Sequence, residues 1–381
     1  MNNKINTTDK IDILKGTDKS PAIIPEIIQE DELFYNMPTS PITDIILRAM
    51  NTNGNLSALT SKRKAINHSQ KISILENNKK RRIKVDSKKY TVTLELSDIE
   101  KLIGSNKSAK KMFVFILIKI NEQAYSDGQL KRNYIEFPLQ ELTDIGFYSR
   151  QQSARTGFKS SMDTLTSLKI SGTLQQRGKK VIEQSSIEVI FTGGNIKNGV
   201  CTVYLNERIS WGFVAIFYTI LPRYCFRLSN RAFDLLCYIF YLARQNTKDI
   251  EEKGYFNIGL RAIQERLNLP SEKDSQNPGR NINNPERDIR QPIEKAIEEI
   301  EELNNNRDFT ITPMYDLKAS ISHYLDDGYL KIELRGKYAE NFVRLSINST
   351  QKIQKAKKRK EAIIEKARIA KLANETTNQY S

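Results

Sequence analysis

One spacing constrains the fold of this chain more than any other feature of its sequence. Segments 121 residues apart share the same pattern of apolar positions: YIEFPLQEL at 134–142 matches YFNIGLRAI at 255–263. The same offset, without a gap, places MFVFILIKI at 112–120 on FDLLCYIFY at 233–241. Two apolar runs can match by chance, but two matches at one offset indicate a supersecondary unit that is used twice.

Both units show the same order of predicted elements. A long apolar helix (106–124 and 229–245) precedes a short strand (134–137 and 255–258), a short helix, a turn, a longer helix and further strands. The run MFVFILI could also be a buried strand. The second copy has helical spacing, and the repeat extends this assignment to the first; the residues concerned are Leu236, Cys237, Phe240 and Ala243.

The longer helix of the first unit is expected to begin near Ser149, which would be its N-cap. Its buried stripe would consist of Ala154, Phe158, Met162 and Leu165. Strands are expected at 171–176, 187–192 and 200–206, with the basic tetrapeptide RGKK at 177–180 as the tip of a hairpin between the first two.

In the second unit the longer helix is expected at 286–304 and the strands at 308–313 and 328–334. Pro292 lacks an N–H group and should kink this helix or mark its true start. The buried stripe would consist of Ile289, Ile293, Ile297 and Ile300.

A helix, a helix–turn–helix and a β-hairpin together make a winged helix, so we predict an α+β chain with two tandem winged-helix domains. The expected boundaries are a disordered, basic-ended N-terminal region at 1–87, the first domain at 88–208, an apolar connector at 209–224, the second domain at 225–350 and a basic helical tail at 351–381. The connector has no Gly/Ser-rich character and should hold the two domains in a fixed orientation.

The net charge of +15 is concentrated in two segments. Residues 61–90 contain eleven Lys and Arg against two acidic residues, and residues 352–371 contain nine against two, giving +9 and +7. Basic arms on a nearly neutral globular region favour a polyanionic partner, because each neutralised phosphate releases counterions. Solvated charge on disordered ends remains the alternative.

Several exposed polar and basic residues are candidates for contact with double-stranded DNA. Residues of these types at the start of a helix can reach base edges and phosphates in a major groove. The candidates are Arg150, Gln152, Arg155, Thr156 and Lys159 on the first long helix, Arg177, Lys179 and Lys180 at the hairpin tip, Arg280, Arg287, Arg290 and Gln291 at the start of the second, and Lys79, Lys80, Arg81 and Arg82 in the arm. Glutamates occupy the later turns of the second helix. The alternative to DNA contact for this helix is therefore contact with another protein through its acidic face.

Other function classes receive no support from the sequence. The only histidines, His68 and His323, are far apart, and no phosphate-binding Gly-x-x-x-x-Gly-Lys-Ser/Thr loop is present. The three cysteines lack metal-ligand spacing and indicate buried thiols in a reducing compartment. No apolar run is long enough to span a membrane. We therefore expect a cytoplasmic protein with no enzymatic activity and no cofactor.

The layout resembles the plasmid replication initiator (Rep) proteins. The similarity spans about 90–345 and is carried by the progression FNIGLRAIQERLNLP, RDIRQPIEKAIEEIEELNNNRDFTITPMYD and YLKIEL, with LPRYCFRLSNRAFDLLCYIF similar to the entry into the family's second domain. The residues that carry it are Leu260, Leu267, Pro292, Ile293, Ala296 and Ile300.

This resemblance implies an initiator that binds origin repeats, helps recruit host replication proteins and forms a homodimer when it represses its own gene. A transcriptional regulator without a replication role is the alternative, and a nucleoid or partition adaptor is a third. SKRK at 61–64 and KKRRIKV at 79–85 also resemble a bipartite nuclear-import signal, which a phosphate-binding arm would explain equally.

Overall fold

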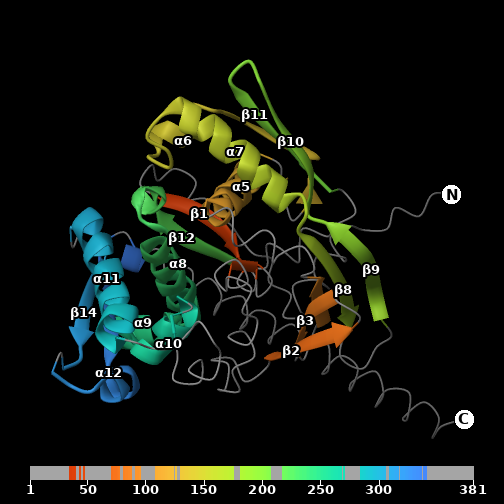
Figure 1. Cartoon of the computed structure of the whole chain (residues 1–381). Helices are drawn as coiled ribbons and strands as arrows, with labels where there is room; N and C mark the ends of the chain where they lie inside the picture. Colours follow the sequence, from red (N-terminus) through yellow and green to blue (C-terminus); the bar gives the residue numbers. More distant parts are fainter. Residues whose placement is uncertain are drawn as a thin grey trace, which may run out of the picture.

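The chain contains two units in which the same core elements follow in the same order (Figure 1). The first consists of α5 (Ala109–Gln123), β7 (Tyr134–Pro138), α6 (Glu141–Asp144), α7 (Gln151–Leu165), β10 (Phe191–Lys197) and β11 (Val200–Leu205). The second consists of α8 (Asn230–Gln245), β13 (Tyr255–Gly259), α10 (Leu260–Arg266), α11 (Gln291–Asn304), β14 (Phe309–Met314) and β15 (Tyr329–Leu334). The computed structural model describes residues 34–39, 43, 46–47, 70–77, 80–87, 91–95, 108–123, 125–126, 129–175, 181–206, 217–267, 269–270, 284–305, 309–316, 318–336 and 338–340.

Each unit closes with a three-stranded antiparallel sheet of the same order. In the first, β11 lies between β10 and β7, and in the second β15 lies between β14 and β13. Helix, strand, two helices and a pair of strands is the winged-helix arrangement, so the predicted α+β fold with two tandem winged helices is confirmed. The offset is confirmed too, since α5 and α8, and likewise β7 and β13, begin 121 residues apart.

Apolar periodicity explains the element types. Helix α5 is buried around its whole circumference, from Ala109 to Asn121, which is why its sequence carries no amphipathic pattern. Strand β7 alternates instead, burying Ile135 and Phe137 on one face. The predicted stripes of α7 and of the helix around α11 are both buried as expected.

The hairpin expected as the wing of the first unit lies in a different sheet. β8 (Lys169–Gln175) and β9 (Val181–Val189) extend a five-stranded sheet with β2 (Gln70–Asn77), β3 (Lys80–Ser87) and β4 (Thr91–Glu95). The wing is the β10–β11 hairpin, whose turn residues Asn198 and Gly199 have φ of 51° and 76°. Two positive φ angles define a type I′ turn, whose twist matches the flanking strands. The prediction that 171–176 and 187–192 form the wing was therefore wrong.

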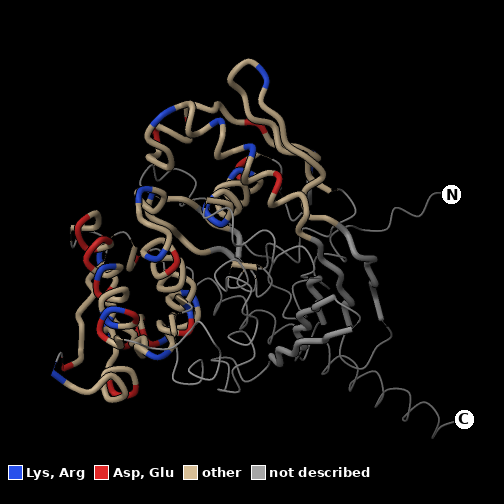
Figure 2. The backbone as a smooth tube through the Cα atoms, in the orientation of Figure 1, with Lys and Arg blue, Asp and Glu red and all other residues tan. Residues whose placement is uncertain are grey.

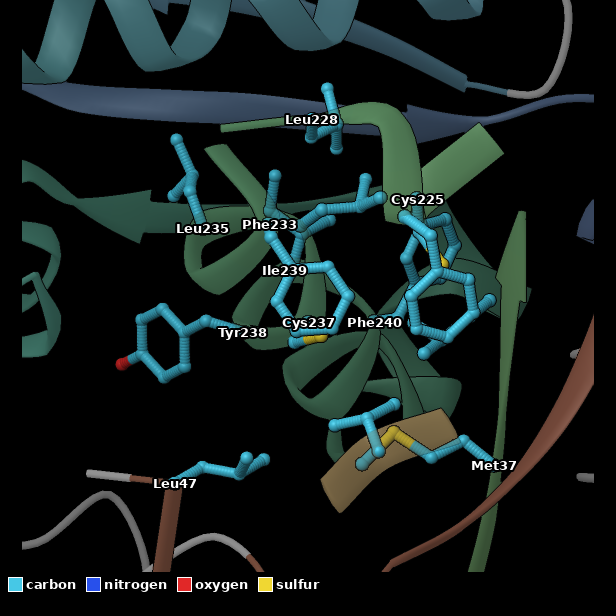
Figure 3. Packing of buried hydrophobic residues seen from close by; sticks show 14 of the residues in the cluster. Met37, Leu47, Cys225, Leu228, Phe233, Leu235, Cys237, Tyr238, Ile239 and Phe240 are labelled. Carbon is cyan, nitrogen blue, oxygen red and sulfur yellow. The ribbon is translucent and has the colours of Figure 1, made fainter. Parts of the chain in front are cut away.

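The N-terminal region, 1–87, was expected to be mostly disordered, but it contributes strands. β1 (Phe34–Thr39) pairs antiparallel with β12 (Phe217–Pro222), a segment of the predicted connector. Met37 and Leu47 are buried in the same apolar cluster as Phe233 and Phe240 of α8 (Figure 3). A short apolar stretch in a polar segment thus gains its strand conformation from a partner far along the chain. β2 and β3 also lie within 1–87.

The segment that joins the units packs against both of them. Phe226, in the short helix η3 (Arg223–Arg227), lies 5.7 Å from the ring of Phe115 on α5 and 5.8 Å from that of Phe233 on α8. Tyr224 donates a hydrogen bond of 3.3 Å to Asn304 on α11. Tyr224 belongs to the predicted connector 209–224 and Phe226 lies just after it. The fixed orientation of the two domains stays a prediction, and residues 209–216 lie outside the described part of the chain.

Two further helices had no sequence prediction. α9 (Thr247–Lys253) precedes β13, and α12 (Ile321–Asp327) lies between β14 and β15, where a plain hairpin was expected. Ser320 caps α12 by accepting a hydrogen bond from the N–H of His323. The remaining short strands are β5 (Tyr125–Ser126) and β6 (Gln129–Leu130). The predicted basic helix at 351–381 lies outside the described residues.

Candidate nucleic-acid interface

Helix α5 holds the helix–turn–helix of the first unit in position. Lys119 on α5 forms ion pairs of 2.7 Å with both Glu122 and Glu141, the first residue of α6. Burial works against the charge of Lys119, but the two carboxylates outweigh it, and the pKa of Lys119 is raised. Leu142, the second residue of α6, is fully buried. The position of α6 is therefore set by a charged contact and an apolar contact together.

The turn between α6 and α7 is packed as tightly as the helices. Gly146 has a φ of 75°, in the left-handed region that favours glycine. The rings of Phe147 and Tyr148 stack 4.5 Å apart, and Phe147 lies 5.7 Å from Phe226 of η3. A Cβ on Gly157 of α7 would overlap the Tyr148 hydroxyl. The angle between α6 and α7 thus depends on the close packing of Tyr148 against Gly157, where a side chain would not fit.

Helix α7 presents a polar face opposite its buried stripe. Arg150, not Ser149, occupies the N-cap position, and no side chain caps this end, so the predicted Ser149 cap was wrong. The first N–H groups of the helix are consequently free of a side-chain acceptor, a favourable place for an anion. All five candidates of this helix are exposed: Arg150, Gln152, Arg155, Thr156 and Lys159.

The wing lies beside this face. Leu139, just before α6, donates a backbone hydrogen bond of 2.7 Å to the carbonyl of Gly199 in the wing turn. Burial raises the pKa of Cys201 on β11 to about 12, and the nearby charge of Arg155 opposes this rise. A Cβ on Gly194 of β10 would overlap the side chain of Met162 on α7, so the wing packs directly against this helix.

Lys197 is a candidate that the sequence prediction missed. It ends β10, is exposed, and directly precedes the turn. The signal was available, because Asn-Gly between two alternating segments is the strongest short hairpin pattern. The predicted tip residues, Arg177, Lys179 and Lys180, lie outside the described part of the chain.

The corresponding end of α11 offers much less. A π-turn at Glu286–Arg290 precedes α11, and Pro292 lies in its first turn, as Pro292 was expected to mark the start. Gln291 and Arg287 are exposed, but the Arg287 Nε donates to Asp288 at 2.8 Å. That hydrogen bond and the carboxylate charge raise the pKa of Arg287. Arg280 lies outside the described residues.

Arg290 is a structural residue, which contradicts its predicted role in DNA contact. Its guanidinium donates to the carbonyl of Ala319 at 2.9 Å, pairs with Glu286 at 3.0 Å and lies 4.7 Å from the centre of the Tyr324 ring. Only 7% of the residue is exposed. Helical periodicity alone could not place it inside, because α12, which supplies Tyr324, was not foreseen.

The two units differ in surface charge as well. Figure 2 shows blue residues along α7 and near the tip of the β10–β11 hairpin, and red residues along α11. Burial, followed by repulsion from Glu286, raises the pKa of Glu294, and burial with repulsion from Glu298 raises that of Glu301. A negative surface of this kind repels phosphates.

Part of the basic arm belongs to described strands. Lys80, Arg81 and Arg82 belong to β3, paired with Asn77, Glu76 and Leu75 of β2. Lys79 lies outside the described residues, as does the whole of 352–371.

Metal-binding and membrane-spanning features are absent from the described residues. No group of three or more His, Cys, Asp or Glu side chains there could hold a metal ion. No helix among them has both the length and the apolar character needed to cross a membrane. All three cysteines, Cys201, Cys225 and Cys237, are buried and free, as expected.

Comparison with known proteins gives structural similarity only. No protein-family model and no characterised protein matches the sequence. Among solved structures, the Pi initiator protein in complex with iteron DNA aligns at 15% identity with a TM-score of 0.40, covering 60% of this chain and 90% of that one. Domains 2 and 3 of RctB align at 10% identity with a TM-score of 0.34, covering 71% of this chain and 93% of that one. A selenomethionine form of the same RctB domains aligns at 8% identity with a TM-score of 0.37, covering 76% and 99%.

Proposed function

We propose that this chain is a sequence-specific DNA-binding protein that initiates replication. It binds repeated duplex sites at an origin, helps recruit host replication proteins, and acts in the cytoplasm by binding alone, without a catalytic step. Duplex binding is the core of the proposal, and the initiator role builds on it through the sequence resemblance.

The observation that carries the proposal is the surface formed by α7 and the wing. Arg150, Arg155 and Lys159 form no ion pair with any described residue, although they lie on a well-packed helix. Unpaired cations beside a helix N-terminus suit phosphate oxygens. The N-terminal turns of such a helix also carry the side chains that contact base edges in a major groove.

The wing adds a second contact beside α7. A hairpin whose tip carries Lys197 beside a tight Asn-Gly turn can approach the DNA backbone closely, since neither turn residue has a bulky side chain. The first unit therefore makes the principal contact. The second unit contributes a smaller contact through Arg287 and Gln291, because its remaining surface on α11 is acidic.

The second candidate function is a transcriptional regulator without a replication role. This function is favoured when the acidic face of α11 binds another protein, for example the second copy in a homodimer. Both functions share the α7 surface, so they differ in what the bound DNA does next and not in how it is bound.

The experiment has two stages. First, the full chain selects from a random duplex library, and the Arg155→Ala/Lys159→Ala variant is compared with a Lys295→Ala control, an exposed lysine on α11. We expect the double variant to lose affinity and the control to retain it. Equal affinity of all three proteins would rule out the α7 surface as the contact.

Second, the selected site is located in the DNA around the gene, and that DNA is tested for autonomous replication dependent on the protein. Repeated sites that support replication are expected. A single site in a promoter, with repression and no replication, would instead establish the regulator.

A further inference from the structure

The two helices of the first helix–turn–helix are joined by a chain of side-chain hydrogen bonds. Gln140, at the N-cap of α6, donates from its Nε2 to Thr143 Oγ1 and to Asp144 Oδ1, both at 2.8 Å. Its Oε1 in turn accepts from the Nε2 of Gln151, the first residue of α7. Gln151 was not among the residues that the sequence singled out.

The chemistry of the neighbours fixes the direction of these bonds. The Asp144 carboxylate can only accept, so the amide nitrogen of Gln140 must face it. The Thr143 hydroxyl gives its own proton to the Gln140 backbone carbonyl at 2.7 Å, and it therefore accepts from the Gln140 amide. With both N–H bonds of Gln140 used, its Oε1 is left for Gln151, which must donate.

This orientation defines what Gln151 still offers. One of its two N–H bonds is used, so one N–H donor and the Oε1 acceptor remain on an exposed carboxamide. In a major groove adenine presents an acceptor at N7 next to a donor at N6, whereas guanine presents acceptors at both N7 and O6. The free edge of Gln151 is complementary to adenine and mismatched to guanine.

We propose that Gln151 reads an adenine in the major groove and that Gln140 is the residue that positions it. The inference rests on the proposed duplex binding by α7 and gives that binding a base preference. Gln140 restricts the rotamers of a flexible side chain before binding, and this lowers the entropy lost when the base contact forms.

The test compares base preference among full-length variants. Selection by the unmodified chain should give one position with adenine, and Gln151→Ala should lose that preference by about 5- to 150-fold, the range of a bidentate base contact. Replacing that adenine with 7-deazaadenine removes N7; it should weaken binding of the unmodified chain and leave binding of Gln151→Ala unchanged. Gln245→Ala, an exposed glutamine at the end of α8, is the matched control and should keep the preference.

The positioning role has its own variants. Gln140→Glu keeps the acceptor for Gln151 but faces Asp144 with a second carboxylate, so it should reduce the adenine preference. Gln140→Glu/Asp144→Asn restores a donor opposite that carboxylate and should recover the preference. A purely structural role for Gln140 would change unfolding and overall affinity without changing the ratio between adenine and the other bases.

The outcomes separate the two levels of the proposal. A chain that selects no duplex sequence at all overturns both the proposed function and this inference. A selected site whose adenine preference survives in Gln151→Ala overturns only the reading by Gln151. Equal preference in Gln140→Glu and the unmodified chain overturns the positioning role.

Discussion

The ammonium group of Lys110, on α5, forms an ion pair with the carboxylate of Asp234, on α8, and both side chains are 7% exposed. The pair joins the first helix of one winged-helix unit to the first helix of the other. Beside it, Lys111 donates to the backbone carbonyl of Phe226 at 3.2 Å and to that of Leu228. Two adjacent lysines thus hold the second unit and the segment leading into it against the first.

Removal of one partner of this pair should be costly. Asp234→Asn removes the carboxylate that pairs with the buried ammonium of Lys110, and we expect a loss of about 3–5 kcal/mol in the free energy of unfolding. Urea unfolding of the full chain measures it. Lys110→Met/Asp234→Leu removes both charges and should restore much of the stability. A double variant as unstable as Asp234→Asn would show that the charges themselves are not the cause.

Gly157→Ala should destabilise the chain although alanine normally favours a helix by about 0.5–1 kcal/mol over glycine. The added Cβ would overlap the Tyr148 hydroxyl, and overpacking of this kind costs about 1–3 kcal/mol. Chemical denaturation gives the change. In a Tyr148→Leu background the same substitution should no longer destabilise, and a persistent loss there would place the strain elsewhere.

Substitutions of Arg290 and Arg287 should have different effects, the first on stability and the second on DNA binding. Arg290→Met removes a guanidinium bonded to Ala319 and packed on Tyr324, and it should lower stability by about 2–3 kcal/mol while the salt dependence of DNA binding stays unchanged. Arg287→Met, at an exposed position, should leave stability unchanged and reduce that salt dependence. Calorimetry and binding at several salt concentrations check both. The reverse pattern would return Arg290 to the DNA interface.

The basic arm is tested by charge removal, because deletion of 61–90 would also remove β2 and β3. Four Lys/Arg→Gln changes at Lys79, Lys80, Arg81 and Arg82 should weaken binding to every duplex. The slope of log affinity against log salt should fall by about 0.9 for each phosphate that the arm no longer neutralises. Truncation of 352–371 should act in the same way. A full slope in either variant would show that the segment does not bind phosphates.

The sequence determined the repeated unit, and with it the fold class. Local sequence patterns predict helix α5, the alternating burial of strand β7 and the buried stripe of α7. Because the unit is repeated, each pattern occurs twice in the sequence. The exposed candidates on α7 could be predicted from its buried stripe, because a helix that buries Ala154 and Phe158 must present Arg155 and Lys159 to solvent.

Tertiary structure alone decided which segments meet. Lys110 and Asp234 are 124 residues apart, and β1 pairs with β12 from the other half of the chain. The wing is formed by β10–β11 and not by β8–β9, because the pairing of a strand depends on all the strands of its sheet. The charge of the residues in a turn does not determine that pairing. Arg290 has the sequence pattern of a surface residue, and only α12 covers it. Long-range contacts of this kind have no signature in sequence spacing, because they depend on which faces remain unburied after the local elements have formed.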